Sequence, residues 1–320
     1  MNILVTGAAG FLGSHLVDRF LADGDSVVGV DNFVTGSESN LAHIGSTRRF
    51  SFVRADVSQP WTWASDTVRP DLIMHFASPA SPVDYGREPL ATMAVNALGT
   101  MHSVEVARAT GARLVFASTS ETYGDPLEHP QRETYWGNVN PIGVRACYDE
   151  AKRYGEAYLT SAVRELGIDG RIVRIFNTYG PRMQPGDGRV VPSFCLSALR
   201  GEPLTVYGDG RQTRSFCYVD DLIDGIVRLA KRDGLAGRVV NIGSPHEFTI
   251  RELAQIVAEL AEVPLAVVAC DLPPDDPTRR KPDISLARAL LGWEPKIALR
   301  DGLLATLDYF RSLSTARAVR

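Results

Sequence analysis

The sequence predicts an α/β protein built on a doubly wound parallel sheet with a smaller C-terminal lobe. Two observations predict the sheet. Short apolar runs alternate with helical patterns through the first half of the chain, and a glycine turn joins the first run to the helical pattern behind it. Parallel strands joined by crossover helices require this alternation. The six strand-like runs are NILVTG, SVVGVD, FSFVRAD, LIMHFAS, RLVFASTS and GRIVRIFN.

The bulk properties limit the class of protein. A chain of 320 residues is long enough for one large domain or two modest ones. Its hydrophobic content of 44% and charged content of 22% are those of a globular protein, which excludes disordered and membrane proteins. No apolar run approaches the ~18 residues of a membrane span. A net charge of −4 without a basic tract argues against a nucleic-acid partner.

The cysteines and the N-terminus indicate a cytoplasmic protein. The chain enters a strand at its second residue, with no basic region before an apolar stretch, so we expect no signal peptide. The cysteines are far apart and show no C-x-x-C spacing, so we expect reduced thiols and no metal site. They are Cys147, Cys195, Cys217 and Cys270.

A strand, a glycine turn and a helix start form the first predicted ligand site. The run NILVT is followed by GAAGFLG, which contains Gly7, Gly10 and Gly13. Gly7 permits the turn, Gly10 lets backbone amides approach a pyrophosphate, and Gly13 allows the helix to pack closely on the strand. The G-x-x-G-x-x-G spacing departs from the standard dinucleotide fingerprint. Asp31 ends the second run, where an acid would hold the adenosine ribose hydroxyls and repel a 2′-phosphate, so the predicted cofactor is NAD.

Polar side chains end the fifth apolar run. Thr119, Ser120 and Glu121 stand where the carboxyl end of a strand would face a ligand. Thr119 would bind a substrate hydroxyl, Ser120 would assist, and Glu121 would act as an acid or base. The alternative is a turn rich in Ser and Thr that caps the next helix, with Glu121 as a capping carboxylate.

Tyr148 and Lys152 lie in the run ACYDEAKR, where a helix would place both side chains on one face, one turn apart. An ammonium at that spacing lowers the pKa of a phenol, so the pair would act as a proton-transfer device. The alternative is a surface tyrosine packed under a lysine stem. The glycine turn and the polar strand end favour the catalytic interpretation.

Two helical stretches are long, roughly Glu88 to Ala109 and Tyr148 to Leu166, and both carry apolar residues on more than one face. The excess apolar face predicts a homodimer formed through these helices. The alternative is that both faces are buried within one subunit.

The character of the chain changes beyond about Pro181, where Gly, Pro and Arg become frequent. We expect residues 1–180 to form an NAD-binding domain and residues 181–320 to form mainly a substrate-binding lobe, with segments near 215–245 returning to the sheet. The tail from Leu286 to Ser314 predicts two amphipathic helices, separated by Gly292, Trp293 and Pro295.

These motifs together resemble a known family. The glycine triplet, the Thr119 to Glu121 triplet and the pair Tyr148 and Lys152 are similar to those of the extended short-chain dehydrogenase/reductases, Rossmann-type enzymes that modify nucleotide sugars. Longer stretches most resemble the UDP-glucuronate decarboxylases, also called UDP-xylose synthases. These stretches are HFASPASPVDY, ASTSETYGDP, HPQRETYWGNVNPIGVRACYDEAKR, RIFNTYGPRM, DGRVVPSF, PLTVYGDGRQTRSFCYVDDL and DDPTRRKPDI.

The resemblance implies a lyase that holds NAD tightly and converts UDP-glucuronate to UDP-xylose. Tyr148 would take the proton of the C4 hydroxyl while NAD takes the hydride, and Thr119 would share the C4 oxygen. The 4-keto acid then loses carbon dioxide, and NADH returns its hydride to C4. Lys152 would bind the nicotinamide ribose, Glu121 would lie near the ring, and Arg280 would lie near the substrate carboxylate.

The resemblance also implies contact residues for the nucleotides. The further cofactor contacts are Phe11, Leu12, Asn32, Asp56, Val57, Ala77, Ser78, Asn96 and Arg189. The further substrate contacts are Pro82, Tyr85, Asn177, Val191, Tyr207, Gln212 and Arg214. Within these sets, Asn177 would bind phosphate and Arg214 would clamp the pyrophosphate of UDP with its planar guanidinium.

Three alternatives share the NAD site. A UDP-glucuronate 4-epimerase uses the same substrate, but epimerases of the family usually carry a small hydroxyl or apolar residue at the position of Glu121. A 4,6-dehydratase would carry an Asp-Glu pair, whereas Ser120 precedes Glu121 here. A protein that binds NAD without catalysis would be expected to lack Tyr148 or Lys152, and both are present.

Overall fold

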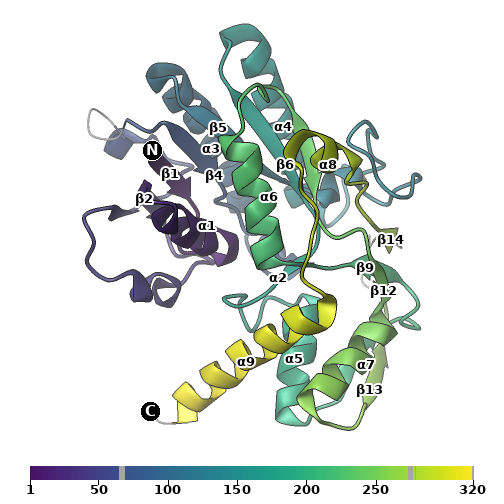
Figure 1. Ribbon diagram of the computed structural model, residues 1–320. Helices are drawn as coiled ribbons and strands as arrows, with labels where there is room; N and C mark the ends of the chain where they lie inside the picture. Colours follow the sequence, from purple (N-terminus) through teal and green to yellow (C-terminus); the bar gives the residue numbers. More distant parts are fainter. Residues whose placement is uncertain (65–68, 273–276, 278, 319–320) are drawn as a thin grey trace.

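A seven-stranded parallel sheet forms the centre of the protein (Figure 1). The computed structural model describes residues 1–64, 69–272, 277 and 279–318, with side chains to residue 313. The strand order is β11-β6-β5-β4-β1-β2-β3, which confirms the predicted doubly wound sheet and all six predicted strands. The strands are β1 (Asn2–Thr6), β2 (Ser26–Asp31), β3 (Phe50–Arg54), β4 (Leu72–His75), β5 (Arg113–Thr119), β6 (Gly170–Ile175) and β11 (Val239–Ile242).

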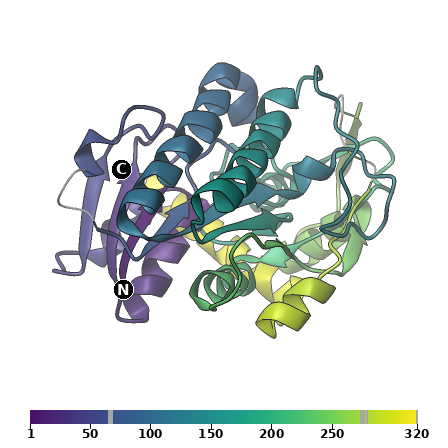
Figure 2. The ribbon, with the colours of Figure 1, turned by 90° about the horizontal axis from the view of Figure 1, so that it is seen from above.

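Helices cover both faces of the sheet (Figure 2). On one face α1 (Phe11–Ala22) packs beside α6 (Val219–Lys231). On the other face α3 (Pro89–Thr110) packs along α4 (Ala146–Leu166), and these are the two long helices expected from the sequence. A short helix, α2 (Pro82–Arg87), precedes α3.

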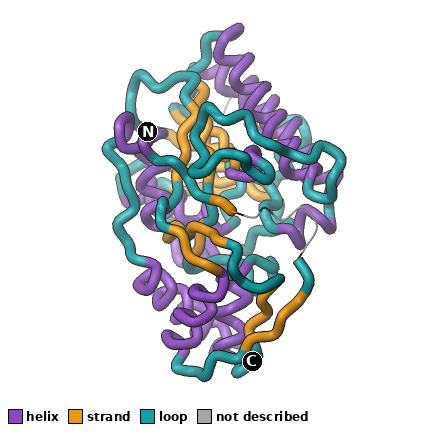
Figure 3. The backbone as a smooth tube through the Cα atoms, turned by 90° about the vertical axis from the view of Figure 1, so that its right-hand side faces the viewer, coloured by secondary structure: helices purple, strands orange, loops and turns teal. Residues whose placement is uncertain are grey.

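A smaller lobe lies below the carboxyl ends of the strands in Figure 1. Its helices pack on one another, and Figure 3 shows its short strands apart from the main sheet. The helices are α5 (Val190–Arg200), α7 (Ile250–Ala261) and α9 (Leu299–Ala318). The paired strands are β8 (Leu204–Tyr207) with β13 (Val267–Cys270), β9 (Thr213–Ser215) with β12 (Glu247–Thr249) and β14 (Arg279–Arg280), and β7 (Thr178–Tyr179) with β10 (Cys217–Tyr218).

The C-terminal tail forms two helices, α8 (Ser285–Leu291) and α9, as the sequence predicts. Gly292 ends α8 with a φ of 58°, a left-handed conformation that glycine adopts without strain. Trp293 then packs against Gly225 of α6, where an added Cβ would lie 2.9 Å from the indole ring. The indole N–H donates to the carbonyl of Asp221 over 2.9 Å. The carboxylate of Asp221 accepts from the backbone amides of Lys296 and Ile297, which fixes the chain between the two helices.

Two groups of buried apolar side chains form the core. One lies between the sheet and the helices α3 and α4, and it includes Phe116 and Leu159. The other begins under α1 with Phe20 and continues without a break into the lobe, where it includes Phe194 and Phe310. The lobe therefore shares its core with the sheet.

Within the described residues, no helix is both long enough and apolar enough to cross a membrane. All four cysteines lie in the described ranges, and none of them is in a disulfide.

Candidate active site

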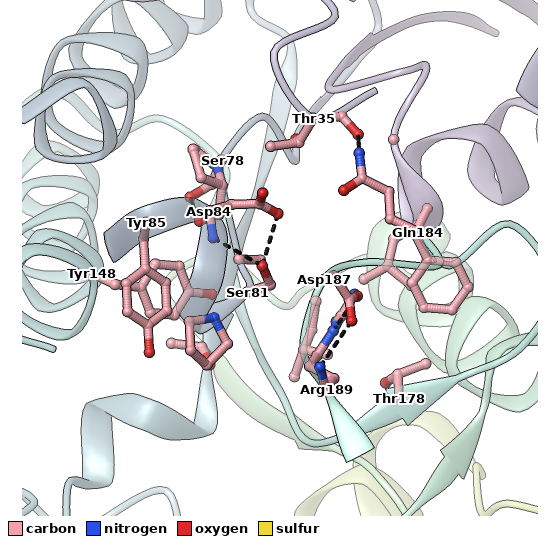
Figure 4. Close-up of a pocket in the computed structure, with 18 of the residues that line it drawn as sticks. Thr35, Ser78, Ser81, Asp84, Tyr85, Tyr148, Thr178, Gln184, Asp187 and Arg189 are labelled. Carbon is pink, nitrogen blue, oxygen red and sulfur yellow. Dashed lines mark hydrogen bonds and ion pairs between the residues drawn. The ribbon is translucent and has the colours of Figure 1, made fainter. Parts of the chain in front are cut away.

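A cavity of about 720 Å³ lies between the carboxyl ends of the strands and the lobe. Every residue predicted for the site lines this cavity except Asn96 (Figure 4 shows part of the wall). The structure thus gathers into one space residues that are spread along the sequence from Gly7 to Arg280. They are Gly7, Gly10, Phe11, Leu12, Gly13, Asp31, Asn32, Asp56, Val57, Ala77, Ser78, Pro82, Tyr85, Thr119, Ser120, Glu121, Tyr148, Lys152, Asn177, Arg189, Val191, Tyr207, Gln212, Arg214 and Arg280.

The glycine turn forms one wall of the cavity, between β1 and α1. A Cβ on Gly13 would lie 1.9 Å from the carbonyl oxygen of Gly7, so no larger residue fits there without a backbone shift. Gly10 is the N-cap of α1 and offers no side chain to the first amides of the helix. These amides are therefore available to an anion, and they fit the pyrophosphate of a dinucleotide.

Asp31 lies at the end of β2 on the same wall. Its carboxylate accepts hydrogen bonds from the amides of Ala9, over 2.9 Å, and Phe33, over 2.8 Å. Burial raises the pKa of Asp31, and the amides oppose that rise. The carboxylate of Asp31 also lines the cavity, where ribose hydroxyls could donate to it.

Asn96 lies on α3 behind the cavity wall. Its side-chain amide donates to Ser78 Oγ over 2.9 Å and to the carbonyl of Thr92 over 2.8 Å. Its Oδ1 is buried and has no partner among the described residues. Asn96 therefore does not line the cavity itself, but it binds Ser78, which does.

Tyr148 lies in the first turn of α4, and its ring is stacked on that of Tyr85, with centroids 5.1 Å apart (Figure 4). Burial raises the pKa of the Tyr148 phenol, and a hydrogen bond with Thr119 is the largest effect that lowers it. The predicted net lowering of this pKa is therefore wrong.

The burial of Lys152 explains why the pKa of Tyr148 is not lowered. Its ammonium donates to the carbonyl of Ala117 over 2.7 Å and lies 5.8 Å from the centre of the Tyr148 ring. Burial lowers the pKa of Lys152 to about 7. Loss of hydration disfavours the charged form of both groups, so it weakens the effect of the ammonium on the phenol.

Glu121 lies between two arginines at the end of β5, in a short 3-10 turn (Ser120–Tyr123). Its Oε2 accepts from Arg145 over 2.7 Å and from Arg280 over 3.3 Å. Burial alone would raise the pKa of Glu121, but Arg280, Arg145 and Arg214 outweigh it and hold the pKa at about 2. Glu121 is therefore ionised at neutral pH.

The predicted substrate contacts come from both sides of the cavity. Arg214 on β9 donates to the carbonyls of Thr213 and Pro277. Gln212 donates to the carbonyl of Tyr207 over 2.7 Å. The remaining contacts stand on three further elements: Pro82 on α2, Asn177 after β6, and Arg189 and Val191 at the start of α5.

The structure adds residues that the sequence did not single out. Arg145 lines the cavity and binds Glu121. Gln184 donates to the carbonyl of Thr35 across the cavity, and Asp187 binds the guanidinium of Arg189 (Figure 4). The only signal for Arg145 was its place in the stretch HPQRETYWGNVNPIGVRACYDEAKR. In the stretch DDPTRRKPDI, positions 275, 276 and 278 lie outside the described residues.

Comparisons with known proteins agree with this geometry. Residues 3–243 match the model of the NAD dependent epimerase/dehydratase family. The chain is 51% identical to a protein of Arabidopsis thaliana named UDP-glucuronic acid decarboxylase 6, over 97% of this chain and 89% of that protein. It is 48% identical to UDP-glucuronic acid decarboxylase 1 of Xenopus tropicalis, over 97% of this chain and 72% of that protein.

A solved structure has the same fold. It is the UDP-glucuronic acid 4-epimerase of Bacillus cereus in complex with UDP-glucuronic acid and NAD, with a TM-score of 0.88 and 30% sequence identity. The similarity covers 98% of this chain and 100% of the epimerase. The chain therefore belongs to the NAD-dependent epimerase/dehydratase family.

Proposed function

We propose that this protein is an NAD-dependent UDP-glucuronate decarboxylase that forms UDP-xylose through a 4-keto intermediate. The observation that carries the proposal is the contact of the Glu121 carboxylate with Arg145 and Arg280, in the same cavity as Tyr148 and Thr119. Relatives about 50% identical over nearly the whole chain are named for this activity.

Residues 1–180, with the segment near 215–245, bind NAD in this proposal, and the lobe binds the UDP-sugar. The glycine turn and Asp31 hold the pyrophosphate and the adenosine ribose. Arg214 and Asn177 bind the phosphates of UDP. When bound, NAD supplies a reversible acceptor for the C4 hydride and a positive charge that favours the phenolate of Tyr148.

The oxidation of C4 needs a base beside its hydroxyl. The Tyr148 phenolate takes the hydroxyl proton, and Thr119, already hydrogen-bonded to Tyr148, shares the C4 oxygen. Stacking on Tyr85 restricts the phenol ring to one orientation. Tyr148 later returns the same proton when the ketone is reduced, so it acts as base and then as acid.

Loss of carbon dioxide follows from the 4-keto group, because the C5 carboxylate is then that of a β-keto acid. The bond between C5 and the carboxyl carbon breaks, its electron pair forms an enolate, and C5 takes up a proton. Arg280 binds the carboxylate before the bond breaks. The negative charge of Glu121 beside the sugar ring disfavours the charged carboxylate of the substrate and favours its loss as neutral carbon dioxide.

Product analysis tests the function. Purified protein with NAD and UDP-glucuronate should release carbon dioxide and form a UDP-pentose, measured by mass spectrometry. UDP-galacturonate without gas would establish a 4-epimerase instead. No turnover with intact nucleotide binding would indicate a protein that only binds NAD.

We also propose a homodimer formed through α3 and α4, and a cytoplasmic location. Large apolar side chains stand exposed on these helices, among them Leu90, which is 78% exposed, with Met93 and Tyr154. The four unpaired thiols support the location. Light scattering should give twice the chain mass of 34.9 kDa, and a monomer mass would remove the dimer.

A further inference from the structure

Two arginines share one oxygen of Glu121, and they hold it unequally. Arg145 Nη2 lies 2.7 Å from Oε2, which is the length of a close charge-assisted hydrogen bond. Arg280 Nη2 lies 3.3 Å from the same oxygen and also donates to the carbonyl of Gly124 over 2.9 Å. Arg145 is therefore the closer of the two partners.

Arg280 keeps donors for another group. It is 1% exposed, and its Nε and Nη1 are buried without a partner among the described residues. A buried N–H without an acceptor is unfavourable, and more so in a charged group. Because Arg280 lines the cavity, an anion bound there would satisfy these donors.

A second carboxyl group follows Arg145 on α4, where the amide of Asp149 donates to the carbonyl of Arg145 over 3.1 Å. Asp149 lies one helical turn beyond Arg145 and is 6% exposed, with an Oδ1 that has no partner among the described residues. Burial, followed by the charge of Glu121, raises the pKa of Asp149 to about 7, while Arg145 and Arg280 oppose the rise. The other titratable groups around Asp149 are Glu150, Tyr85, Tyr148 and Cys147.

We propose that Arg145 is a positioning residue that holds Glu121, so that Arg280 stays available for the carboxylate of the substrate, and that Asp149, one turn along α4, is a second carboxyl group that can compete for Arg145. This inference rests on the proposed decarboxylase function. Two buried carboxylates beside one arginine would compete for it, and protonation of Asp149 removes the competitor. Without Arg145, the free Glu121 would draw Arg280 away from the substrate.

The inference separates two steps of one reaction. Oxidation at C4 depends on the phenol of Tyr148, whereas loss of carbon dioxide depends on Arg280 and Glu121. Arg145 contacts Tyr148 through the backbone, where its carbonyl accepts from the Tyr148 amide over 3.0 Å, and a substitution of the Arg145 side chain keeps this bond. Weakening Arg145 should therefore slow decarboxylation more than oxidation. Reduced nucleotide should then accumulate on the enzyme, because the 4-keto acid is formed but not consumed.

The first test is Arg145→Gln in the full-length protein loaded with NAD. With UDP-glucuronate, the release of carbon dioxide should fall about 100-fold, while the rate at which reduced nucleotide appears at 340 nm stays within about threefold of wild type. Arg145→Lys, which keeps the charge, should recover part of the loss. The control is Arg132→Gln, because Arg132 lies in the same loop but is exposed and pairs only with Asp283 in the described structure.

The outcomes decide the inference. Equal losses of both rates, or no loss of either, would overturn it. If the wild-type protein releases no carbon dioxide, the proposed function fails, whereas an active wild type with an unaffected Arg145→Gln removes only the role of Arg145. If Arg145→Gln does not fold, Arg145→Lys is compared with wild type in its place, again by the ratio of the rate of carbon dioxide release to the rate of C4 oxidation.

The second test is Asp149→Asn, which fixes the neutral state. In wild type, the ratio of decarboxylation to oxidation should fall as pH rises through about 7, because the ionised Asp149 competes for Arg145. In Asp149→Asn this fall should disappear, while the ratio at pH 6 stays that of wild type. Identical pH profiles for the two proteins would overturn the role of Asp149.

Discussion

At the scale of single residues, burial decides the ionisation of the site. Tyr148 and Lys152 are both buried, and their pKa values move in opposite directions, each toward the neutral form. Glu121 is buried too, yet three arginines keep it ionised. A buried group in this site is therefore charged only where fixed opposite charges surround it.

Replacing Tyr148 tests the proton transfer. Tyr148→Phe keeps the stacking on Tyr85 but removes the phenol oxygen, so the rate of C4 oxidation should fall about 10²- to 10⁴-fold. Single-turnover formation of reduced nucleotide measures this rate. Nucleotide affinity should change little, and oxidation at the wild-type rate would remove Tyr148 from its role.

The stability of the protein should depend on Asp149 and pH. The pKa of Asp149 is higher in the folded state, about 7, than in the unfolded chain, so the folded state binds more protons between these two values and is destabilised as pH rises through this window. Asn cannot ionise. The stability of Asp149→Asn relative to wild type should therefore grow between pH 5 and pH 8, as measured by thermal denaturation; a constant difference would contradict the raised pKa.

The sequence could predict the types of residue in the site but not which of them are ionised. Tyr148, Lys152 and Glu121 carry recognisable motifs. The direction of the pKa shift of Tyr148 depends on how deeply the residue is buried. The local spacing of residues in the sequence does not reveal that burial. Arg145 became visible because folding brings Glu121 against it, and Asp149 because burial and the charge of Glu121 raise its pKa. The place of Arg280 came from resemblance alone.

At the scale of elements, the turn between β1 and α1 depends on close backbone contact. Gly13→Ala would place a Cβ 1.9 Å from the carbonyl oxygen of Gly7 and force the helix start away from the strand. We expect weaker NAD binding and a lower melting temperature. The control is Gly86→Ala, because a Cβ on Gly86 meets no atom within 4 Å and should leave NAD affinity unchanged. Equal affinities of the two variants would contradict the packing argument.

The main strands were predictable because each is an apolar run bounded by polar residues or glycine. The strands β7, β10 and β14 have only two residues each and carry no periodicity. Their pairing partners lie far away in the sequence, since β14 follows β9 by more than sixty positions. Long-range pairing, rather than local propensity, creates these short strands.

At the scale of the whole molecule, the sheet and the lobe share one core. Trp293 is fully buried in the larger apolar group and joins α6 to the tail. Trp293→Ala should lower the free energy of unfolding by about 3–5 kcal/mol. Denaturant unfolding followed by fluorescence and by circular dichroism should give one coincident transition. Two separate transitions would show that the lobe unfolds independently of the sheet.

The path of the chain adds a consequence for assembly of the fold. After β6 the chain enters the lobe with α5 and β8, returns to the sheet with α6 and β11, enters the lobe again with α7, and crosses once more between α8 and α9. The sheet takes strands from both halves of the polypeptide, whereas all the elements of the lobe lie in the second half. Synthesis on the ribosome must therefore pass β11 before the sheet is complete and reach α9 before the lobe is complete, and a chain that stops before β11 would leave both bodies unfinished.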